Sequence, residues 1–347
     1  MDRLRALVYG TVLLLIVGWV LYAGKAIFVP AVLGAVIVYV IVGLAHALGR
    51  VPTLGRALPL QLRYLFSIAA IGLVGFLFAY LVMANKERAL ALAPQYQQSL
   101  LAAIQRMAVY FGFETEPTWA TLRQDLLAQI DLQRMLGSLL ASVGSIVVTF
   151  VVVLLYATFL LLERRHFDAK LANLSDDPAR VARIRQVIEA INRRIGSYLA
   201  LKTLLSVLLG VASYAVMRFF GLEFAALWAV LAGFLNFVPY VGSVLGVVLP
   251  VLMTIVQFED LGTVLTMLLS LSALQFAIGN FLDPYVMGSS LNLSAFAILV
   301  SLAVWSELWG VPGAFLAVPI TAILTIVLSE FPGTRPIALL LSRSGRL

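Results

Sequence analysis

The chain has 347 residues, of which 62% are hydrophobic and only 12% are charged, and its mean hydropathy is +1.02. A soluble domain is about half apolar and about a quarter charged, so this composition excludes an ordinary soluble domain and predicts a polytopic membrane protein. The net charge of +7 fits the excess of lysine and arginine in cytoplasmic loops and needs no nucleic acid partner.

Uncharged runs predict the membrane spans, and the expected class is an all-α transmembrane bundle. The first two runs, 6–24 and 26–49, are separated by Lys25 alone and predict a tight hairpin. In chain order we expect three spans, an extracytoplasmic amphipathic helical segment, a fourth span, a cytoplasmic amphipathic helical segment, further spans with two interrupted hairpins, and a cytoplasmic tail. These segments are 1–85, 86–138, 139–162, 163–197, 198–330 and 331–347.

Lysine and arginine also predict the orientation. Residues 164–198 carry eight basic side chains, and 50–63 and the C-terminal tail carry three each. Residues 86–134 instead balance five basic residues against five acidic ones. We therefore expect both termini in the cytoplasm, residues 86–134 outside, and an even number of crossings.

The long cytoplasmic segment predicts a capped amphipathic helix. Asp177 is a suitable N-cap and Pro178 suits the first helical position. An apolar stripe follows at helical spacing, comprising Val181, Ile184, Ile188, Ile191 and Ile195. Such a helix packs on the bundle or on the membrane surface.

A stretch of thirty-five uncharged residues, 224–258, organises the C-terminal half. It is too long for one span of about 20 residues but suits two helical legs. The break is expected between Asn236 and Gly242, a segment that also holds Pro239 and Tyr240, because proline removes a donor and glycine relaxes the backbone. A broken helix exposes carbonyl and N–H groups together, which suits a hydrophilic solute or a cation. For Asn236 alone, the structural alternative is a hydrogen bond between helices.

A second break is expected in the apolar region 291–329. Its signals are Gly310, Pro312, Gly313 and Pro319. Gly/Pro turns also join ordinary hairpins, so this break is the weaker pointer to a pathway.

Ionisable residues within apolar spans are candidates for function. Lys202 lies in the fifth span, where the alternative is a lysine that snorkels to the cytoplasmic interface. Asp283-Pro284 closes a span one turn after Asn280, where the alternative is a helix-end turn. Glu307 lies between Trp305 and Trp309, where the alternative is an interfacial turn in an aromatic belt.

Motifs of enzymes and of ATP-driven transport are missing. The chain has no phosphate-binding loop, no HExxH and no GxSxG pattern, so we expect neither an enzyme nor a bound cofactor. It has no cysteine, and its two histidines leave little for a metal site.

Several short motifs appear in order and together resemble the autoinducer-2 exporter family of bacterial membrane transporters. They are Ile191-Asn192-Arg193-Arg194-Ile195, Lys202-Thr203, Asn236 to Gly242, Asn280 to Pro284 with Met287-Gly288, and Trp309 to Gly313 followed by Ala317 to Thr321. Where family members commonly have glutamate before the proline, this chain has Asp283, and Glu307 is an acid that not every member has.

The resemblance implies a protein of the bacterial plasma membrane that assembles as a homo-oligomer, with a ring-like pentamer among the arrangements. Members of the family are associated with export of the furanosyl quorum-sensing signal, or with exchange of sodium or lithium against protons.

Three functions are therefore considered. The first is a secondary exporter of a small hydrophilic solute, which uses the neutral polar break at Asn236. The second is a cation/proton antiporter in which Asp283, Glu307 and Lys202 titrate. The third is a non-transporting membrane scaffold that recruits partners through 86–134 or 164–198.

Overall fold

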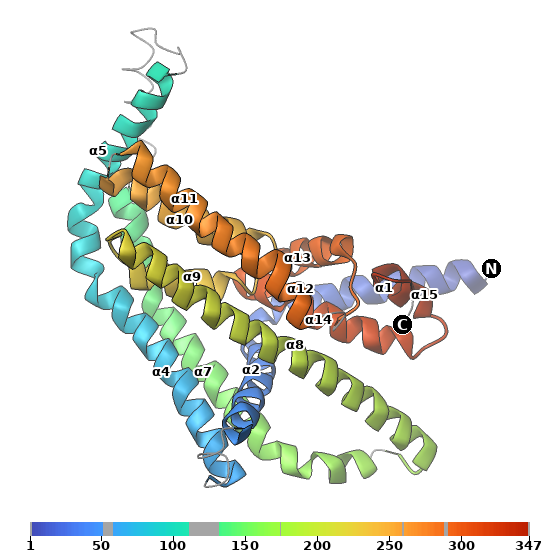
Figure 1. Cartoon of the computed structure of the whole chain (residues 1–347). Coiled ribbons are helices and arrows are strands. Elements are labelled where there is room, and N and C mark those ends of the chain that lie inside the picture. Colours follow the sequence, from blue (N-terminus) through green and yellow to red (C-terminus); the bar gives the residue numbers. More distant parts are fainter. Residues whose placement is uncertain are drawn as a thin grey trace. The chain divides into compact units, whose positions relative to one another are not determined.

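The computed structural model describes residues 2–50, 58–110, 132–173, 175–258, 260–287 and 291–345. Within these ranges the chain is helical, and extended residues meet only in an isolated bridge between Leu293 and Ser342. The elements (Figure 1) are α1 Asp2–Ala23, α2 Lys25–Arg50, α4 Leu60–Ala84, α5 Lys86–Tyr110, α7 Leu132–Ala172, α8 Pro178–Phe219, α9 Ala225–Leu235, α10 Val241–Phe258, α11 Leu261–Phe276, the π-helical η1 Ala277–Leu282, α12 Asp283–Met287, α13 Ala295–Trp309, α14 Val311–Ser329 and α15 Arg335–Leu341.

Among the described residues, seven helices are long and apolar enough to cross a membrane. They are Lys25–Gly49, Leu60–Ala84, Ala141–Arg164, Pro178–Phe219, Val241–Phe258, Leu261–Val286 and Val311–Ser329. Shorter apolar helices occur at Val8–Ala23, α9 and α13. The predicted all-α polytopic class is confirmed, whereas the number of crossings stays a prediction.

The helices form two compact units, each assembled from separate stretches of the chain. Unit 1 comprises Met1–Gly72, Thr149–Thr203 and Met287–Leu347. Unit 2 comprises Leu73–Val148 and Leu204–Val286. The two expected broken regions therefore fall in different units, α9–α10 in unit 2 and α13–α14 in unit 1.

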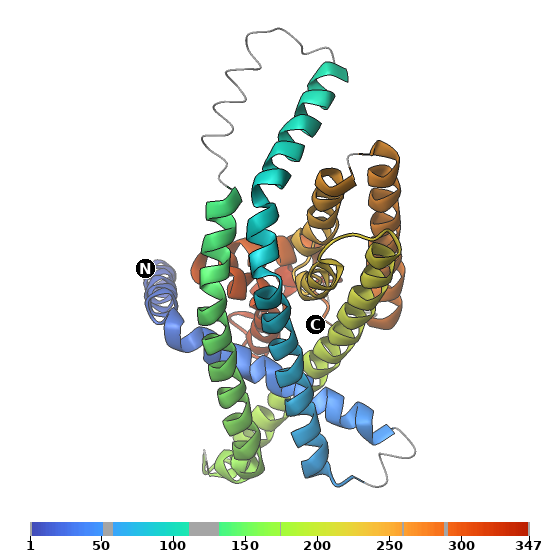
Figure 2. The ribbon, with the colours of Figure 1, turned by 90° about the vertical axis from the view of Figure 1, so that its left-hand side faces the viewer.

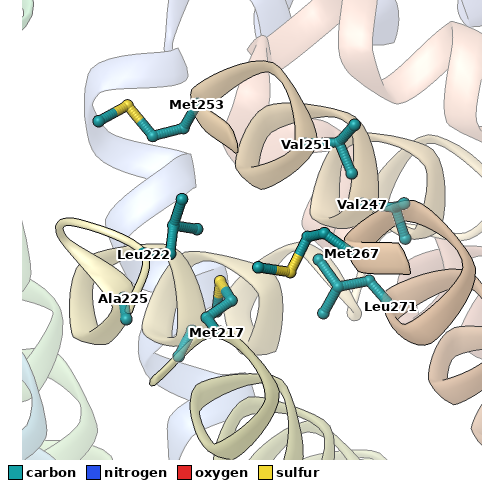
Figure 3. Packing of buried hydrophobic residues seen from close by; sticks show 9 residues of the cluster. Met217, Leu222, Ala225, Val247, Val251, Met253, Met267 and Leu271 are labelled. Atoms are coloured by element: carbon teal, nitrogen blue, oxygen red, sulfur yellow. The ribbon is translucent and has the colours of Figure 1, made fainter. Parts of the chain in front are cut away.

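Unit 2 is built around the C-terminal end of α8 and the helices α9, α10 and α11. Its core contains Met217 and Met267, both fully buried, together with smaller aliphatic side chains. Figure 3 shows the side chains of these two methionines pointing toward one another. Because methionine is flexible, the pair fills the irregular space between the helices.

Unit 1 has two small cores on the hairpin of α13 and α14. One core joins Ile195 and Leu199 of α8 to Val318 and Ala322 of α14. The other contains Val29, Trp309 and Leu316 from α2, α13 and α14, respectively. Helix α14 contributes to both cores, so it is the central helix of this unit.

Two expectations about helix boundaries need correction. Helices α1 and α2 meet at Gly24, but Figures 1 and 2 show the second running in a new direction instead of doubling back as a hairpin. The amphipathic helix that the sequence predicts in the cytoplasm and the predicted fifth span are one continuous helix, α8, of 42 residues. No proline follows Pro178 within it, so nothing in its sequence stops the helix. The predicted cap is confirmed, since Asp177 accepts a hydrogen bond of 2.9 Å from the N–H of Ala179.

Candidate functional site

The break between α9 and α10 lies where the sequence places it, at residues 236–240. Tyr240 adopts a φ of 60°, an uncommon value for a residue with a side chain. A Cβ atom on Gly242 would lie 1.7 Å from the carbonyl oxygen of Leu235, so only glycine fits there. Glycine therefore allows the first turn of α10 to sit directly against the last residue of α9.

Five of the six backbone N–H groups between Asn236 and Gly242 donate within this segment or to α9, so most of the N–H groups expected to be exposed are engaged. The N–H of Val238 donates to Leu235 at 2.8 Å, and the N–H of Gly242 donates to Val238 at 2.9 Å. The N–H groups of Asn236, Phe237 and Val241 also donate to carbonyls of this segment or of α9. A tight turn thus replaces the helical pattern. Side chains are therefore the main polar groups that this break offers to a ligand.

The Asn236 side chain is buried at this break and reaches a second helix. Its Nδ2 donates a hydrogen bond of 3.0 Å to Oγ of Ser206 on α8, and both residues are less than 8% exposed. The two backbones approach closely because glycines face the partner helix. A Cβ on Gly233 would lie 3.0 Å from the Ser206 carbonyl oxygen, and one on Gly210 would lie 3.2 Å from that of Ala229. Small residues thus create the contact, and the amide lies inside it.

The second break, between α13 and α14, consists of Gly310 alone. Its φ of 66° and ψ of −142° favour glycine. A Cβ on Gly313 would lie 1.8 Å from the carbonyl oxygen of Trp305, the same kind of close approach as at Gly242. Pro312 lies in the first turn of α14, where a missing N–H is harmless. Pro319 was expected at a break, but it lies inside α14, which continues to Ser329, and this expectation is corrected.

Asn280, Asp283 and Pro284 lie in one continuous helical run and not at its end. The α-helix α11 passes into the π-helical segment η1, which is followed directly by α12. Asn280 donates from Nδ2 to the Phe276 carbonyl at 3.3 Å. Asp283 is half-buried, and its Oδ1 atom is shielded from solvent. π-Helical segments often occur at functional sites, so the run stays a candidate.

Lys202 and Glu307, the other ionisable candidates, differ in burial. Lys202 on α8 is only 8% exposed. Glu307 is exposed on α13. Beside it, Trp309 is buried and donates from its indole N–H to the Leu21 carbonyl at 2.9 Å. The tryptophan therefore has a packing role in unit 1, whereas the glutamate lies outside that contact.

A polar cluster at Glu223 was missed in the sequence. Glu223 lies between α8 and α9 and accepts hydrogen bonds from Arg88 and Tyr96 of α5, the latter at 2.5 Å. Its own N–H donates to Gln257 of α10 at 2.7 Å. Burial, followed by the hydrogen bond to Glu223 and the charge of that residue, raises the pKa of Tyr96. The available signal was the position of Glu223 at the border of the uncharged run.

Metal ligands do not gather in the part of the chain that the structure describes. No group of three or more histidine, cysteine, aspartate or glutamate residues occurs there.

These observations define a class: a polytopic α-helical membrane protein with helical hairpins that are broken at tight, glycine-dependent turns. The chain belongs to the AI-2E family of transporters, because the model of that family matches residues 10–333. It is therefore a multi-pass membrane transport protein of the bacterial inner membrane.

Individual relatives agree with this assignment. The chain is 30% identical over 287 residues to the AI-2 transport protein TqsA of Escherichia coli K12, an alignment that covers 82% of this chain and 80% of TqsA. It is 34% identical over 200 residues to a Borreliella burgdorferi protein assigned to transport by inference. That alignment covers 57% of this chain and 54% of the relative. YhhT of Escherichia coli K12, likewise assigned to transport by inference, is 28% identical over 281 residues, with 79% and 76% covered.

Proposed function

We propose that the protein is a secondary transporter that exports a small hydrophilic solute, such as an autoinducer-2-like signal or a related metabolite. The observation that carries the proposal is the buried Asn236 amide beside the break in an apolar segment. The name of TqsA as an AI-2 transport protein supports a cargo of this class. The chain acts as a transport protein and not as an enzyme in this proposal.

The placement of Asn236 favours a role beyond holding two helices together. The backbones of α8 and α9 already approach closely through Gly210 and Gly233, which is the usual basis of helix association in a membrane. A buried amide is unfavourable in an apolar setting unless it is hydrogen-bonded, and the hydroxyl partner of Asn236, Ser206 on α8, is a polar group that can also hydrogen-bond a solute. Asn236 and Ser206 thus offer donor and acceptor groups at the point where α9 ends.

The test is efflux of autoinducer-2 from proteoliposomes that contain the purified full chain. Asn236→Ala is expected to lower the initial efflux rate at least about tenfold, the effect of losing one good hydrogen bond to the solute. Asn85→Ala is the control, because it likewise removes an amide, one that donates to the Leu81 carbonyl at 2.7 Å directly after α4 and lies outside the break at residues 236–240. Unchanged efflux in folded Asn236→Ala protein contradicts the role of this residue.

A second candidate function is cation/proton antiport, and the observation that favours it is Asp283. Its carboxyl group is half-buried within a helix that is apolar enough to span the membrane. A carboxylate that binds a proton and a cation in turn is the minimum machinery for exchange. Glu307 and Lys202 are the other titratable groups of this alternative, although the exposure of Glu307 favours Asp283 as the main site.

The same vesicles distinguish the two functions when internal pH is followed under sodium or lithium gradients. Antiport predicts cation-dependent proton movement that the double variant Asp283→Asn/Glu307→Gln lacks. Asp283→Asn and Glu307→Gln, tested separately, then identify which of the two carboxyl groups carries the proton. Absence of proton movement with the unaltered protein, in vesicles that still export solute, contradicts antiport. A scaffold role instead predicts neither flux.

We further propose that both termini lie in the cytoplasm and that the protein is a homo-oligomer. The lysine and arginine distribution supports the orientation, and the family resemblance supports assembly, a pentamer included. The natural lack of cysteine permits a direct test. A membrane-impermeant maleimide applied to intact cells should label Gln98→Cys and leave Ser344→Cys unlabelled until the membrane is opened. The reverse pattern contradicts the orientation.

A further inference from the structure

We propose that unit 1 contains a binding site for a phosphate-bearing anion, in a cavity between α8, α14 and α15. The cavity has a volume of about 580 Å³. The polar and charged residues of its wall include Arg183, Arg194, Thr325, Ser329, Glu330 and Arg335. This site is separate from Asn236 and does not depend on the proposed cargo.

The charge of the cavity is strongly one-sided. The wall contains three arginines and one glutamate, which gives it a net formal charge of +2. Arg183 is the arginine that the glutamate offsets, since its Nε lies 3.6 Å from Oε2 of Glu330 and it also donates to the Glu330 carbonyl at 3.3 Å. Arg194 and Arg335 have no acidic partner among the described residues. Two guanidinium groups, both accessible to solvent, therefore line this cavity without an acidic partner among the described residues.

The hydroxyl groups of the wall are already engaged and do not compete as donors. Thr325 donates to the Thr321 carbonyl at 2.8 Å, and Ser329 donates to the Ile326 carbonyl at 2.6 Å. The charged donors of the wall that are not paired with an acid among the described residues are the guanidinium N–H groups of Arg194 and Arg335. A guanidinium presents a planar fork of donors that matches phosphate oxygens in pairs, so the ligand is expected to be a phosphate group.

One wall of the cavity is held in place by the returning C-terminal segment. Asn292, a wall residue, accepts a hydrogen bond of 3.0 Å from the N–H of Arg343 and one of 3.1 Å from the Ser344 hydroxyl. The N–H of Ser294 donates to the Leu341 carbonyl at 2.9 Å. These bonds connect the segment before α13 to the end of α15. The wall next to the arginines is therefore fixed by hydrogen bonds between two segments of the chain.

The cavity lies where the apolar spans end. Helix α14, an apolar span, ends at Ser329, and Arg183 and Arg194 occupy the charged first half of α8. Basic pockets at this depth suit the phosphate of an anionic lipid headgroup, and a free phosphate offers the same chemistry. The wall also contains apolar side chains such as Leu291 and Ile326, which can contact the part of a ligand next to its phosphate.

The experiment compares two sources of phosphate with the purified full chain. In the first arm, inorganic phosphate is titrated against the protein in neutral detergent and binding is followed by calorimetry. In the second arm, the protein is placed in nanodiscs of phosphatidylcholine with a minor fraction of phosphatidylglycerol, and the retained phosphatidylglycerol is counted by native mass spectrometry. The variant pair is Arg194→Gln/Arg335→Gln. The control pair is Arg185→Gln/Arg193→Gln, which removes the same charge from positions of α8 that are equally exposed but do not line the cavity.

The expected result is that the cavity pair weakens binding at least about tenfold while the control pair changes it less than about twofold. Weaker binding of the cavity pair to both inorganic phosphate and phosphatidylglycerol identifies a site for the phosphate group itself. Weaker binding to phosphatidylglycerol alone identifies a site for a lipid headgroup. The pair Arg194→Lys/Arg335→Lys keeps the charge, and intermediate binding by it supports recognition through the fork. Equal weakening by the cavity and control pairs, or no binding by the unaltered protein in either arm, overturns the proposal. Circular dichroism and a monodisperse elution profile establish that each variant is folded.

Discussion

The phenol of Tyr96 on α5 donates a hydrogen bond of 2.5 Å to Glu223, which lies in the connection between α8 and α9. Glu223 also pairs with Arg88. Through this contact an amphipathic helix outside the apolar spans is joined to the helices that lead into the broken hairpin of unit 2.

Removal of the phenol should loosen α5. Tyr96→Phe deletes one hydrogen bond to a charged group, and since Glu223 is partly exposed and keeps Arg88, we expect a loss of about 1 kcal/mol of stability. Thermal unfolding of the purified protein measures this as a lower midpoint. Tyr285→Phe is the control, because Tyr285 is 89% exposed. An equal midpoint for both variants would show that the Tyr96 contact does not contribute.

Gly242 should be irreplaceable at the first break. Gly242→Ala places a Cβ 1.7 Å from the Leu235 carbonyl oxygen, and because backbone must move to relieve the overlap, we expect a loss of more than about 3 kcal/mol. Yield and elution profile after extraction are the measurements. Gly246→Ala, in the same helix, meets only Ala232 at 3.6 Å and should be tolerated. A folded Gly242→Ala protein with unchanged stability would contradict the geometry of the turn.

Gly313 should be equally sensitive at the second break. Gly313→Ala would bring a Cβ to 1.8 Å from the Trp305 carbonyl oxygen and 3.1 Å from Cβ of Trp309. We expect the hairpin of α13 and α14 to open, with a red shift of tryptophan fluorescence as Trp309 becomes solvated. Gly333→Ala, which meets no atom within 4 Å, serves as the control and should leave the emission unchanged. No shift in Gly313→Ala would argue against a tight hairpin.

The N-cap of α11 predicts a pH effect. Asp260 accepts hydrogen bonds from the N–H of Thr263 at 2.7 Å and from its hydroxyl at 2.8 Å, and these bonds lower the pKa of Asp260. A carboxyl group whose pKa is lowered by folding stabilises the folded state above its unfolded pKa, which is about 3.9, and loses this effect as pH falls through the folded pKa. Asp260→Ala should therefore unfold at a lower temperature than the unaltered protein at neutral pH, and the difference should shrink in acid. A difference that does not depend on pH would contradict this assignment.

Much of the fold was predictable because it depends on composition and short-range pattern. Uncharged runs located the apolar helices, since the hydrocarbon thickness sets their length. The Asp177 cap was predictable because its acceptor lies within two residues of its donor. The break at residues 236–240 followed from Pro239 and Gly242, and the break at Gly310 from its own flexibility. Pro319 failed as a signal because buried packing in α14 tolerates a proline that local rules would place at a helix end.

The sequence by itself determined that this is an all-α membrane transport protein. It also determined where the two long apolar regions of the C-terminal half are interrupted. The pairing of Asn236 with Ser206, the contact of Tyr96 with Glu223, and the gathering of Arg183, Arg194 and Arg335 around one cavity were decided only by the tertiary structure. Each joins residues that are far apart in the chain. Local pattern reports which face of a helix is apolar, but it does not report which other helix packs there, because that choice depends on how side chains from separate helices fit together.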